Sequence, residues 1–412
     1  MPSVVVIGAG VFGASVADRL ARAGWEVTLV DRFEPGHLRA ESGGETRLIR
    51  CCHGPDAFYA RSARRALELW RELGEGVLVE SGVTWFARRE DGWEADSERV
   101  LRGAGIPVER MSPEEGARLF PSVAVDDLAF VLHEPEAGVL RAADGVRALV
   151  RRACEAGARV VIGEAEPDGD RVRLANGAPG RPAASGGAPG RTAARGGAPG
   201  RTAARGGAPA RAAVGRAPGD ASAGRLEADF IVWACGAWLG KLFPQLVPMR
   251  VTFQQLVLFE APPEWNGAGW VDFDAAFYGH ARVEGVGFKV GPDIDGAEVD
   301  PDTRPLEATA GGIAIAREYL GMRFPAMAGA PVASAPGCHY GLTPDGQFLF
   351  ARHPEHPNVW LLGGGSGHGY KHGPALAEHV EAVLTGRENP EPRFALGERA
   401  PARSLRTAGA TP

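Results

Sequence analysis

One stretch near the N-terminus constrains the fold more than any other. Within residues 4–31, a strand, a glycine-rich turn, a helix and a second strand follow one another. Residues 4–7 (Val-Val-Val-Ile) are apolar and mostly β-branched, which is typical of a buried parallel strand. A GxGxxG turn then begins at Gly8, apolar residues recur at helical spacing as far as Ala21, and a second apolar run ends at Asp31. This order is the dinucleotide-binding fingerprint in the context that it requires.

Each part of the turn has a physical role. Gly8 permits the tight turn, Gly10 lets the backbone approach a pyrophosphate, and Gly13 lets helix and strand pack closely. The N–H groups at the helix start would face the phosphates, and the Asp31 carboxylate would accept hydrogen bonds from the ribose hydroxyls. An isolated glycine pattern also occurs in ordinary turns, but here both strands and the helix agree with nucleotide binding. The pattern does not distinguish FAD from NAD.

Charge and cysteine content exclude several classes of protein. The net charge is −6 and the pI is near 6.0, so nothing indicates binding to nucleic acid or to an anionic membrane. No apolar run is long enough to span a bilayer, and the N-terminus lacks the basic start of a signal peptide. The five cysteines are scattered without a CxxC pair, which argues against a disulfide framework or a metal site. We therefore expect a cytoplasmic protein without a bound metal.

The rest of the chain mixes helices with short strands. Amphipathic spacing predicts helices over residues 59–73, 144–157, 313–320 and 374–384. Residues 100–119 contain a short helix and then a second helix start at residues 112–115 (Ser-Pro-Glu-Glu), with Ser112 as the cap. Strand-like runs occupy residues 77–87, 130–140, 158–163, 230–234, 251–259, 276–278, 287–290 and 359–362. Several of these strands lie between pieces of the Rossmann pattern. This arrangement indicates a second, substrate-facing domain inserted into the first.

Residues 177–224 differ in composition from everything around them. The sequence Gly-Ala-Pro-Gly-Arg begins at 177 and recurs at 187 and 197, with almost no large apolar residue between. Such a segment cannot bury enough surface to offset the entropy of ordering it. We interpret it as a disordered expansion at the tip of a hairpin between residues 172–174 and 226–230. A basic segment that binds a partner is the alternative.

Two further stretches carry groups that could bind anions. The strand at 359–362 runs into Gly-rich residues 363–371, which open the next helix and offer backbone N–H groups to an anion or a flavin. Arg47 and Arg50 lie in the second Rossmann connection, where guanidinium groups could grip a cofactor phosphate or a substrate carboxylate. A solvated basic turn is the alternative interpretation of these two arginines.

At this point the chain resembles the monomeric sarcosine oxidase family, which includes N-methyltryptophan oxidase and is of the D-amino-acid-oxidase type. The resemblance covers nearly the whole chain except the repeat, and it implies FAD instead of NAD. Nine blocks carry it: GAGVFG at the start, ETRLIR at 45–50, EPEAGVL at 134–140, CGAW at 235–238, YGHARVEGVGFKVG at 278–291, DPDT at 300–303, CHY at 338–340, HPEHPNV at 353–359 and GSGHGYK at 365–371.

The resemblance implies a role for each matching residue. Cys338 matches the cysteine that bonds covalently to the flavin, and Lys289 matches the lysine that activates oxygen beside it. Arg50 and Lys371 match the pair that binds the substrate carboxylate. The resulting set of catalytic residues is Lys289, Arg50, Lys371, Tyr278, Tyr340 and Asp293. The predicted cofactor-binding residues are Gly8, Gly10, Val11, Phe12, Gly13, Asp31, Arg32, Ser42, Thr46, Arg47, Cys235, Gly236, Trp238, Cys338, Gly365, Gly367, His368, Gly369 and Lys371.

The chain departs from the family on the amine side of the pocket. Asp293 stands where the sarcosine-oxidising members have a histidine, four residues after the active lysine. Ser42 and Gly43 replace histidines just before the ETRLIR block. The carboxylate clamp is therefore kept while the charge around the amine changes, so sarcosine itself is not the expected substrate.

The sequence thus predicts an α/β fold with a Rossmann-type FAD-binding domain and an inserted α+β substrate domain with a mainly antiparallel sheet. The FAD-binding domain would comprise residues 1–76, 141–240 and 334–390, the substrate domain 77–140 and 241–333, and the tail 391–412. The expected reaction is oxidation of a C–N bond in a secondary, N-methyl or cyclic, amino acid, with O2 reduced to hydrogen peroxide. A biosynthetic oxidase or dehydrogenase of the same family, acting on a cyclic imino acid or a tailored metabolite, is the alternative. We expect a monomer whose only partners are a small amino or imino acid and O2.

Overall fold

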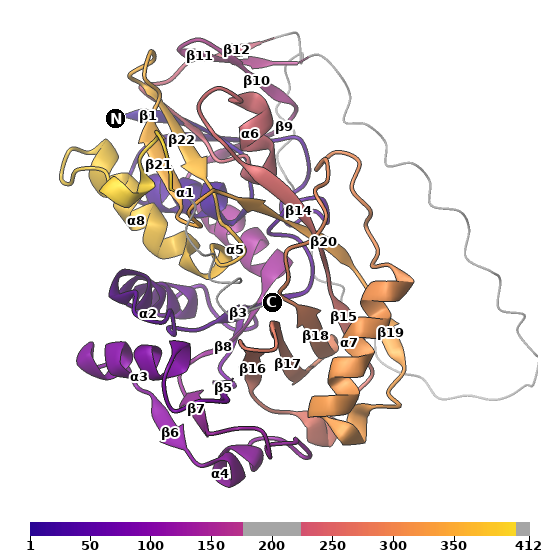
Figure 1. Ribbon diagram of the computed structural model, residues 1–412. Helices are drawn as coiled ribbons and strands as arrows, with labels where there is room; N and C mark the ends of the chain where they lie inside the picture. The colour runs from indigo at the N-terminus through magenta and orange to yellow at the C-terminus, as the bar shows by residue number, and fades with distance from the viewer. Residues whose placement is uncertain (176–223, 401–412) are drawn as a thin grey trace, which may run out of the picture.

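The structure, a computed structural model, describes residues 1–175 and 224–400. Two large sheets dominate it, one in the upper half and one in the lower half of the view in Figure 1. The predicted repeat at 177–224 lies almost entirely outside the described residues, and so do residues 401–412 of the predicted tail. The two strands that flank the repeat, β11 (Arg171–Leu174) and β12 (Arg225–Leu226), pair antiparallel as expected.

The first large sheet has six strands in the order β21-β22-β13-β1-β2-β9. Five of these strands are parallel: β1 (Ser3–Ile7), β2 (Glu26–Asp31), β9 (Arg159–Ile162), β13 (Phe230–Trp233) and β22 (Val359–Gly363). The edge strand β21 (Leu349–Arg352) is antiparallel to β22. Val4 and Val6 face one hydrophobic core, and Val5 and Ile7 face another. Both faces of the sheet are therefore covered, which explains the unbroken apolar runs of its strands.

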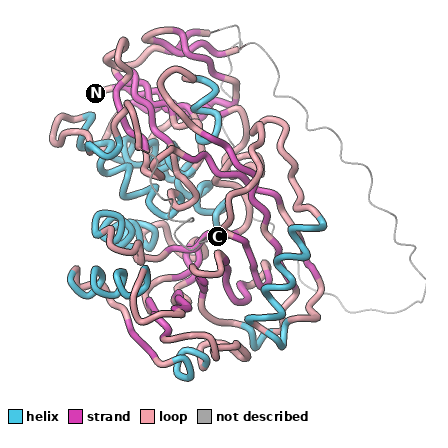
Figure 2. The backbone as a smooth tube through the Cα atoms, in the orientation of Figure 1, coloured by secondary structure: helices cyan, strands magenta, loops and turns pink. Residues whose placement is uncertain are grey.

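Helices cover one face of this sheet. These are α1 (Val11–Arg22), α5 (Ala142–Glu155) and α8 (Gly373–Leu384), with α2 (Ala57–Arg71) packed on α8. The other face carries α6 (Leu239–Leu242) and a three-stranded sheet of β10 (Ala165–Asp168), β11 and β12. Figure 2 shows the helices gathered together beside the strands of this half.

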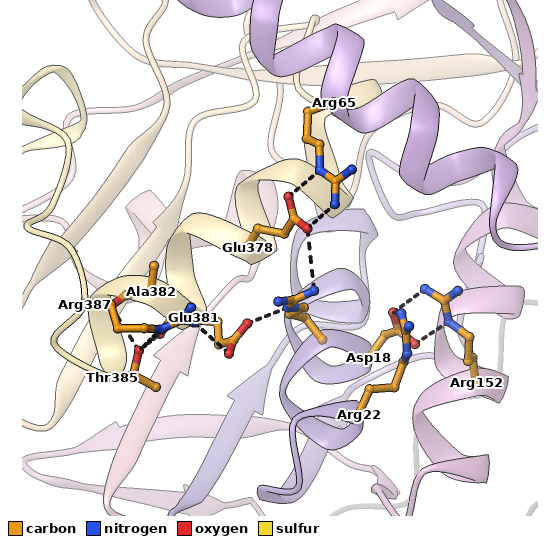
Figure 3. Close-up of polar contacts among 10 residues, drawn as sticks. Asp18, Arg22, Arg65, Arg152, Glu378, Glu381, Ala382, Thr385 and Arg387 are labelled. Atoms are coloured by element: carbon orange, nitrogen blue, oxygen red, sulfur yellow. Dashed lines mark hydrogen bonds and ion pairs between the residues drawn. The ribbon is translucent and has the colours of Figure 1, made fainter.

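Ion pairs fix how the helices lie against one another (Figure 3). Asp18 of α1 is 3% exposed and accepts two hydrogen bonds from the guanidinium of Arg152 in α5, at 2.7 and 2.6 Å. Arg65 of α2 makes a similar two-pronged contact with Glu378 of α8, at 2.9 and 2.8 Å. Because the first pair is partly buried and bidentate, it orients α1 and α5 more strongly than an exposed pair would.

The second large sheet has eight strands in the order β19-β15-β18-β17-β16-β5-β7-β6. Neighbours are antiparallel except for β16 and β5. Its strands are β5 (Val83–Ala87), β6 (Glu109–Met111), β7 (Phe130–Glu134), β15 (Val257–Phe259), β16 (Gly269–Asp272), β17 (Phe277–Val283), β18 (Gly287–Pro292) and β19 (Val332–Ser334). Helix α7 (Ala310–Arg323) packs on one face, and α3 (Trp93–Gly103) contributes to the core on the other.

Two small sheets stand between the large ones. One contains β3 (Thr46–Ile49), β8 (Gly138–Arg141) and β4 (Leu78–Val79), and the other pairs β14 (Arg250–Gln255) with β20 (Gly337–Leu342). They place Thr46, Arg47 and Cys338 at the junction of the large sheets. The fold class predicted from the sequence is confirmed, whereas the domain boundaries remain a prediction.

Some local predictions were wrong. The run 251–259 is not one strand, since β14 and β15 belong to different sheets and separate at Leu256. Helix α3 begins at Trp93, well before the expected region, and is preceded by Gly92 with a φ of 101°. In contrast, α4 (Pro113–Ala117) begins as predicted, with Ser112 and Glu115 forming a capping box. The remaining short helices are η1 (Gly236–Trp238), η2 (Pro263–Trp265), η3 (Pro325–Met327), η4 (Tyr370–His372) and η5 (Pro392–Phe394).

Candidate active site

The glycine turn between β1 and α1 has the close contacts that its sequence predicts. Gly8 has a φ of 104°, and a Cβ added there would lie 2.3 Å from the carbonyl oxygen of Ala234 on the neighbouring strand. A Cβ on Gly13 would lie 1.8 Å from the carbonyl oxygen of Gly8. Gly10 meets only the Ser42 hydroxyl, at 3.3 Å. The first and third glycines are thus required by packing, and the second leaves the backbone open to a ligand.

A cavity of about 400 Å³ extends from this turn along the ends of the parallel strands. Most of the predicted cofactor residues line it: Gly8, Gly10, Val11, Phe12, Asp31, Arg32, Ser42, Arg47, Cys235, Gly236, Trp238, Gly365, Gly367 and Gly369. Tyr340, predicted as a pocket residue, lines it too. The lining does not include the other predicted cofactor-binding residues, which are Gly13, Thr46, Cys338, His368 and Lys371. The sequence interpretation missed several lining residues, including Phe33, Glu41, Lys241, Asp302 and Tyr370.

Asp31 and Ser42 already have backbone partners beside this cavity. Asp31 accepts hydrogen bonds from the N–H groups of Ala9, at 2.5 Å, and Phe33, at 2.8 Å. Desolvation raises the pKa of Asp31, and these two hydrogen bonds oppose that shift. The first N–H of α1, from Val11, donates to the Ser42 hydroxyl at 2.8 Å instead of pointing freely at a ligand. Ser42 therefore lies beside the helix start and satisfies one of its N–H groups.

A group of charged side chains closes one end of the cavity. Asp302 accepts from Arg32 at 2.6 Å, from the indole of Trp238 at 2.8 Å and from Lys241 at 2.6 Å. Burial raises the pKa of Asp302, but the three donors lower it by a larger amount, so the net shift of this pKa is downward. Asp302 thus links the predicted residues Arg32 and Trp238, and its position explains why the DPDT block accompanies the glycine turn.

Arg47, two tyrosines, Cys338 and Lys289 form a connected group at the junction of the sheets. The hydroxyls of Tyr278 and Tyr340 are 3.1 Å apart, and Lys289 Nζ lies 5.5 Å from the centre of the Tyr278 ring. Arg47 Nη2 is 3.8 Å from Cys338 Sγ, and its guanidinium lies over the Tyr370 ring. The structure therefore brings together five residues that the sequence had placed near the flavin.

Lys289 is deeply buried. It lies within β18, is 3% exposed, and donates to the carbonyl oxygen of Thr46 at 3.0 Å. Burial, and next the positive charge of Arg47, lower the pKa of Lys289 to about 7. Its side chain can therefore exist in both protonation states near neutral pH, as suits a group that transfers or holds a proton.

Arg50 is held by groups that the sequence interpretation missed. Its guanidinium lies 4.8 Å from the centre of the Trp85 ring and donates to the carbonyl oxygen of Cys52. Glu134 is 2% exposed and accepts from the N–H of Cys51 at 2.5 Å and from the Trp85 indole at 2.9 Å. Glu134 thus fixes both the backbone turn after Arg50 and the Trp85 ring that the Arg50 guanidinium contacts. Its place in the EPEAGVL block was the only signal available.

Asp293 directly follows the end of β18 and lies near Arg50 and Tyr278. Its charge acts on both Arg50 and Tyr278, and its N–H donates to the carbonyl oxygen of Ala276 at 2.6 Å. Burial lowers the pKa of Arg50, whereas Glu134, Cys52 and Asp293 oppose that shift. Burial, Tyr340 and Asp293 together raise the pKa of Tyr278 well above its usual range. A carboxylate therefore lies near Arg50 and Tyr278, although neither Asp293 nor Arg50 lines the large cavity.

Lys371 lies in η4, where its Nζ donates to the carbonyl oxygen of His368 at 2.9 Å. Three buried histidines adjoin it: His53, His368 and His372, whose ligand atoms lie within 4.8 Å of one another. His53 and His372 are hydrogen-bonded through Nε2 at 3.4 Å. Burial, and next the charge of Lys371, hold the pKa values of His53 and His372 well below the usual range. The same positive charges disfavour a metal cation here, so we interpret the cluster as neutral imidazoles.

All five cysteines fall within the described residues and are free thiols. Cys338 is 8% exposed, and Cys235 lies beside the carbonyl oxygen of Ile7 at 3.4 Å. Burial raises the pKa of Cys235, and the charge of Asp31 raises it further. The Cys235 thiol is therefore disfavoured from ionising, which makes it unreactive.

These features are typical of a Rossmann-type dinucleotide-binding protein, with a glycine turn between the first strand and helix and Asp31 at the end of the second strand. The family model described as FAD dependent oxidoreductase matches residues 3–382. The chain therefore belongs to this family of flavoproteins, and FAD is its cofactor. The glycine cradle and the 400 Å³ cavity suit that group.

Named proteins resemble the chain over nearly its full length. A monomeric sarcosine oxidase from a Bacillus species is 26% identical over 409 residues, covering 93% of this chain and 92% of the relative. An N-methyl-L-tryptophan oxidase from Salmonella heidelberg is 24% identical, covering 93% and 95%. The crystal structure of L-proline dehydrogenase from P. horikoshii superposes with a TM-score of 0.74 at 19% identity, covering 98% and 97%. Residues 1–175 and 224–400 contain no helix that is both long and apolar enough to cross a bilayer.

Proposed function

We propose that this protein is an amine oxidase that uses FAD to oxidise the C–N bond of an amino acid with a secondary amine, either N-methylated or cyclic. The imine product is hydrolysed, and O2 is reduced to hydrogen peroxide. The relatives named sarcosine oxidase and N-methyl-L-tryptophan oxidase support this class of reaction. At about 26% identity they do not identify the substrate.

The observation that carries the proposal is the pair of cations Arg50 and Lys371. Both lie near enough to His53 to lower its pKa, although they come from distant segments of the chain. Two cations that meet one carboxylate form a clamp that fixes the position of the α-carbon. We assign Arg50 and Lys371 to the substrate carboxylate. FAD supplies the acceptor for a hydride equivalent.

Asp293 would govern the amine side. A carboxylate near Arg50 favours a substrate that carries a positive charge close to its own carboxylate, as amino acids do. Tyr278 and Tyr340, joined through their hydroxyls, would line the same side. Lys289 in its protonated form would supply positive charge where O2 is reduced, and this charge would stabilise the superoxide that the first electron produces.

We also propose that Cys338 forms a thioether to the flavin 8-methyl carbon, in which the thiol S–H and one methyl C–H bond break and O2 is the final acceptor of the two electrons and two protons. Its sulfur is buried, and the guanidinium of Arg47 lies 3.8 Å away, where it can stabilise negative charge that develops on the sulfur. Cys338 does not line the large cavity, but Arg47, its neighbour, does. Attachment at this point would anchor the flavin ring at the junction of the two large sheets.

A biosynthetic oxidase or dehydrogenase for a cyclic imino acid is the second candidate. Asp293 favours it, since the carboxylate replaces the histidine expected for sarcosine oxidation. The similarity to a protein named L-proline dehydrogenase is compatible with it at the level of fold.

A substrate panel separates the two candidates. Purified protein would be assayed for peroxide with N-methyl and cyclic amino acids, each compared with its carboxylate ester. An oxidase gives peroxide with the acids and much less with the esters. A dehydrogenase gives turnover only when an artificial electron acceptor replaces O2. Absence of turnover with every acid and either acceptor would refute both candidates.

A further inference from the structure

A second and smaller cavity adjoins the nucleotide cavity, and Arg47 lines both. Its volume is about 60 Å³. The side chains that matter here are Leu38, Leu256, Leu258, Leu306, Lys289 and Cys338. The carboxylate clamp of Arg50 and Lys371 is not part of this lining. The small cavity therefore reaches the group around Lys289 from a side that the proposed substrate site does not occupy.

The lining residues differ sharply in exposure. Leu38 is 59% exposed and Leu306 is 41% exposed, so both lie at the protein surface. Leu256 is 7% exposed, and Leu258 and Lys289 are 2% and 3% exposed. Leu258 of β15 is directly opposite Lys289 of β18 in the antiparallel register, which puts the two side chains on the same face of the sheet. The lining thus leads from solvent to the buried amine.

Size and polarity restrict what could use this path. A volume of about 60 Å³ compares with about 30 Å³ for one water in the liquid, and it is far below the 400 Å³ of the nucleotide cavity. Four leucines and Pro336 make the lining largely apolar, although Glu45, Thr46, Arg47 and Lys289 also belong to it, so most of its surface offers no hydrogen bonds to a charged amino acid. A small apolar molecule such as O2 is excluded neither by the size of the cavity nor by its polarity.

We infer that this leucine-lined cavity conducts O2 from solvent to Lys289, separately from the entry of the amino acid. This inference rests on the proposed oxidase function. At Lys289 the O2 molecule takes two electrons from the reduced flavin, one proton from the reduced flavin and one from solvent. It leaves as hydrogen peroxide, and the flavin returns to its oxidised form.

The test is to narrow the path at its rim. Leu306→Trp places a larger apolar side chain at a partly exposed position, where the fold can accept it. The enzyme with its bound flavin is reduced photochemically without substrate and then mixed with O2 solutions in a stopped-flow instrument. We expect the second-order rate constant for reoxidation to fall about tenfold, which corresponds to an added barrier of about 1.4 kcal/mol.

Two further variants make the result specific. Ile315→Trp is the matched control, because Ile315 on α7 is 44% exposed, close to the 41% of Leu306, and does not line the cavity. It should leave reoxidation unchanged. Leu258→Phe narrows the inner end and should also slow reoxidation. For each variant, the rate of anaerobic reduction by an amino acid substrate should equal that of the wild type, since the substrate enters elsewhere.

The outcomes for the path and for the proposed function are distinct. If reduced wild-type enzyme reacts rapidly with O2 and Leu306→Trp reacts equally fast, the path is wrong and the oxidase proposal stands. If both Leu306→Trp and Ile315→Trp are slowed equally, the effect is not local and the path is again wrong. If the reduced wild-type enzyme barely reacts with O2, the oxidase proposal fails and the path fails with it.

Discussion

Replacing Lys289 with methionine should stabilise the protein at neutral pH while removing the proposed oxygen site. In the unfolded chain the lysine holds its proton up to its ordinary pKa of 10.5, whereas in the folded protein burial lowers the pKa to about 7. Between these two values the unfolded state binds more protons, so the free energy of unfolding falls as the pH falls from 10.5 to 7. Below pH 7, Lys289 is charged in both the folded and the unfolded state, so the loss of stability stays constant.

The size of this loss follows from the two pKa values. Each pKa unit corresponds to 1.36 kcal/mol, so the interval from 10.5 to about 7 amounts to about 5 kcal/mol. Methionine avoids this penalty but leaves the Thr46 carbonyl oxygen without the donor that now lies 3.0 Å away, at a cost of about 1–3 kcal/mol. The expected net gain for Lys289→Met at pH 6 is therefore about 2–4 kcal/mol.

Urea unfolding followed by tryptophan fluorescence would measure this difference at several pH values from 6 to 10. The advantage of Lys289→Met should be greatest at pH 6 and should vanish or reverse toward pH 10. Lys241→Met is the control, since Lys241 is exposed and ion-paired with Asp300 and Asp302, and its removal should give no gain at any pH. Equal pH dependence of wild type and Lys289→Met would refute a lowered pKa for Lys289.

Three other predictions concern the substrate, the flavin and the histidine cluster. Arg50→Met or Lys371→Met should raise KM for an amino acid about 10- to 100-fold in steady-state assays, and should affect its ester much less. Cys338→Ser should release flavin into the supernatant on acid precipitation, whereas wild type keeps it in the pellet. Because His53 and His372 stay neutral when folded but take up protons when unfolded below about pH 6.5, acid should destabilise the fold. His53→Gln should lose less stability than the wild type between pH 7.5 and pH 5 in urea titrations.

Local sequence signals predicted the parts of the fold that depend on neighbours in the chain. The turn at Gly8 and Gly13 was predictable because its constraints lie within a few residues of β1 and α1. The start of α4 was predictable because Ser112 and Glu115 satisfy each other's backbone groups. By contrast, nothing local marks the switch of sheets at Leu256, since both sides of it favour strands and the partners of each side are set by distant chain.

The same distinction between local signals and contacts with distant parts of the chain applies to the candidate site. Motif matches placed Lys289, Tyr278 and Cys338 in one group, and the structure brings them together. Glu134 was missed because its partner Cys51 is 83 residues away, and a carboxylate in a strand gives no sign of such a contact. The histidine cluster joins residues as far as 319 apart, so only the packed fold reveals it.

Anaerobic reduction of the flavin tests the central claim most directly. Purified protein would be mixed without oxygen with N-methyl and cyclic amino acids while its visible absorption is followed, and then exposed to O2. The proposal predicts that at least one such acid bleaches the flavin, that its ester does not, and that O2 restores the colour with formation of hydrogen peroxide. If dithionite bleaches the flavin but no amino acid of the panel does, the assignment of amine oxidation to this site is contradicted.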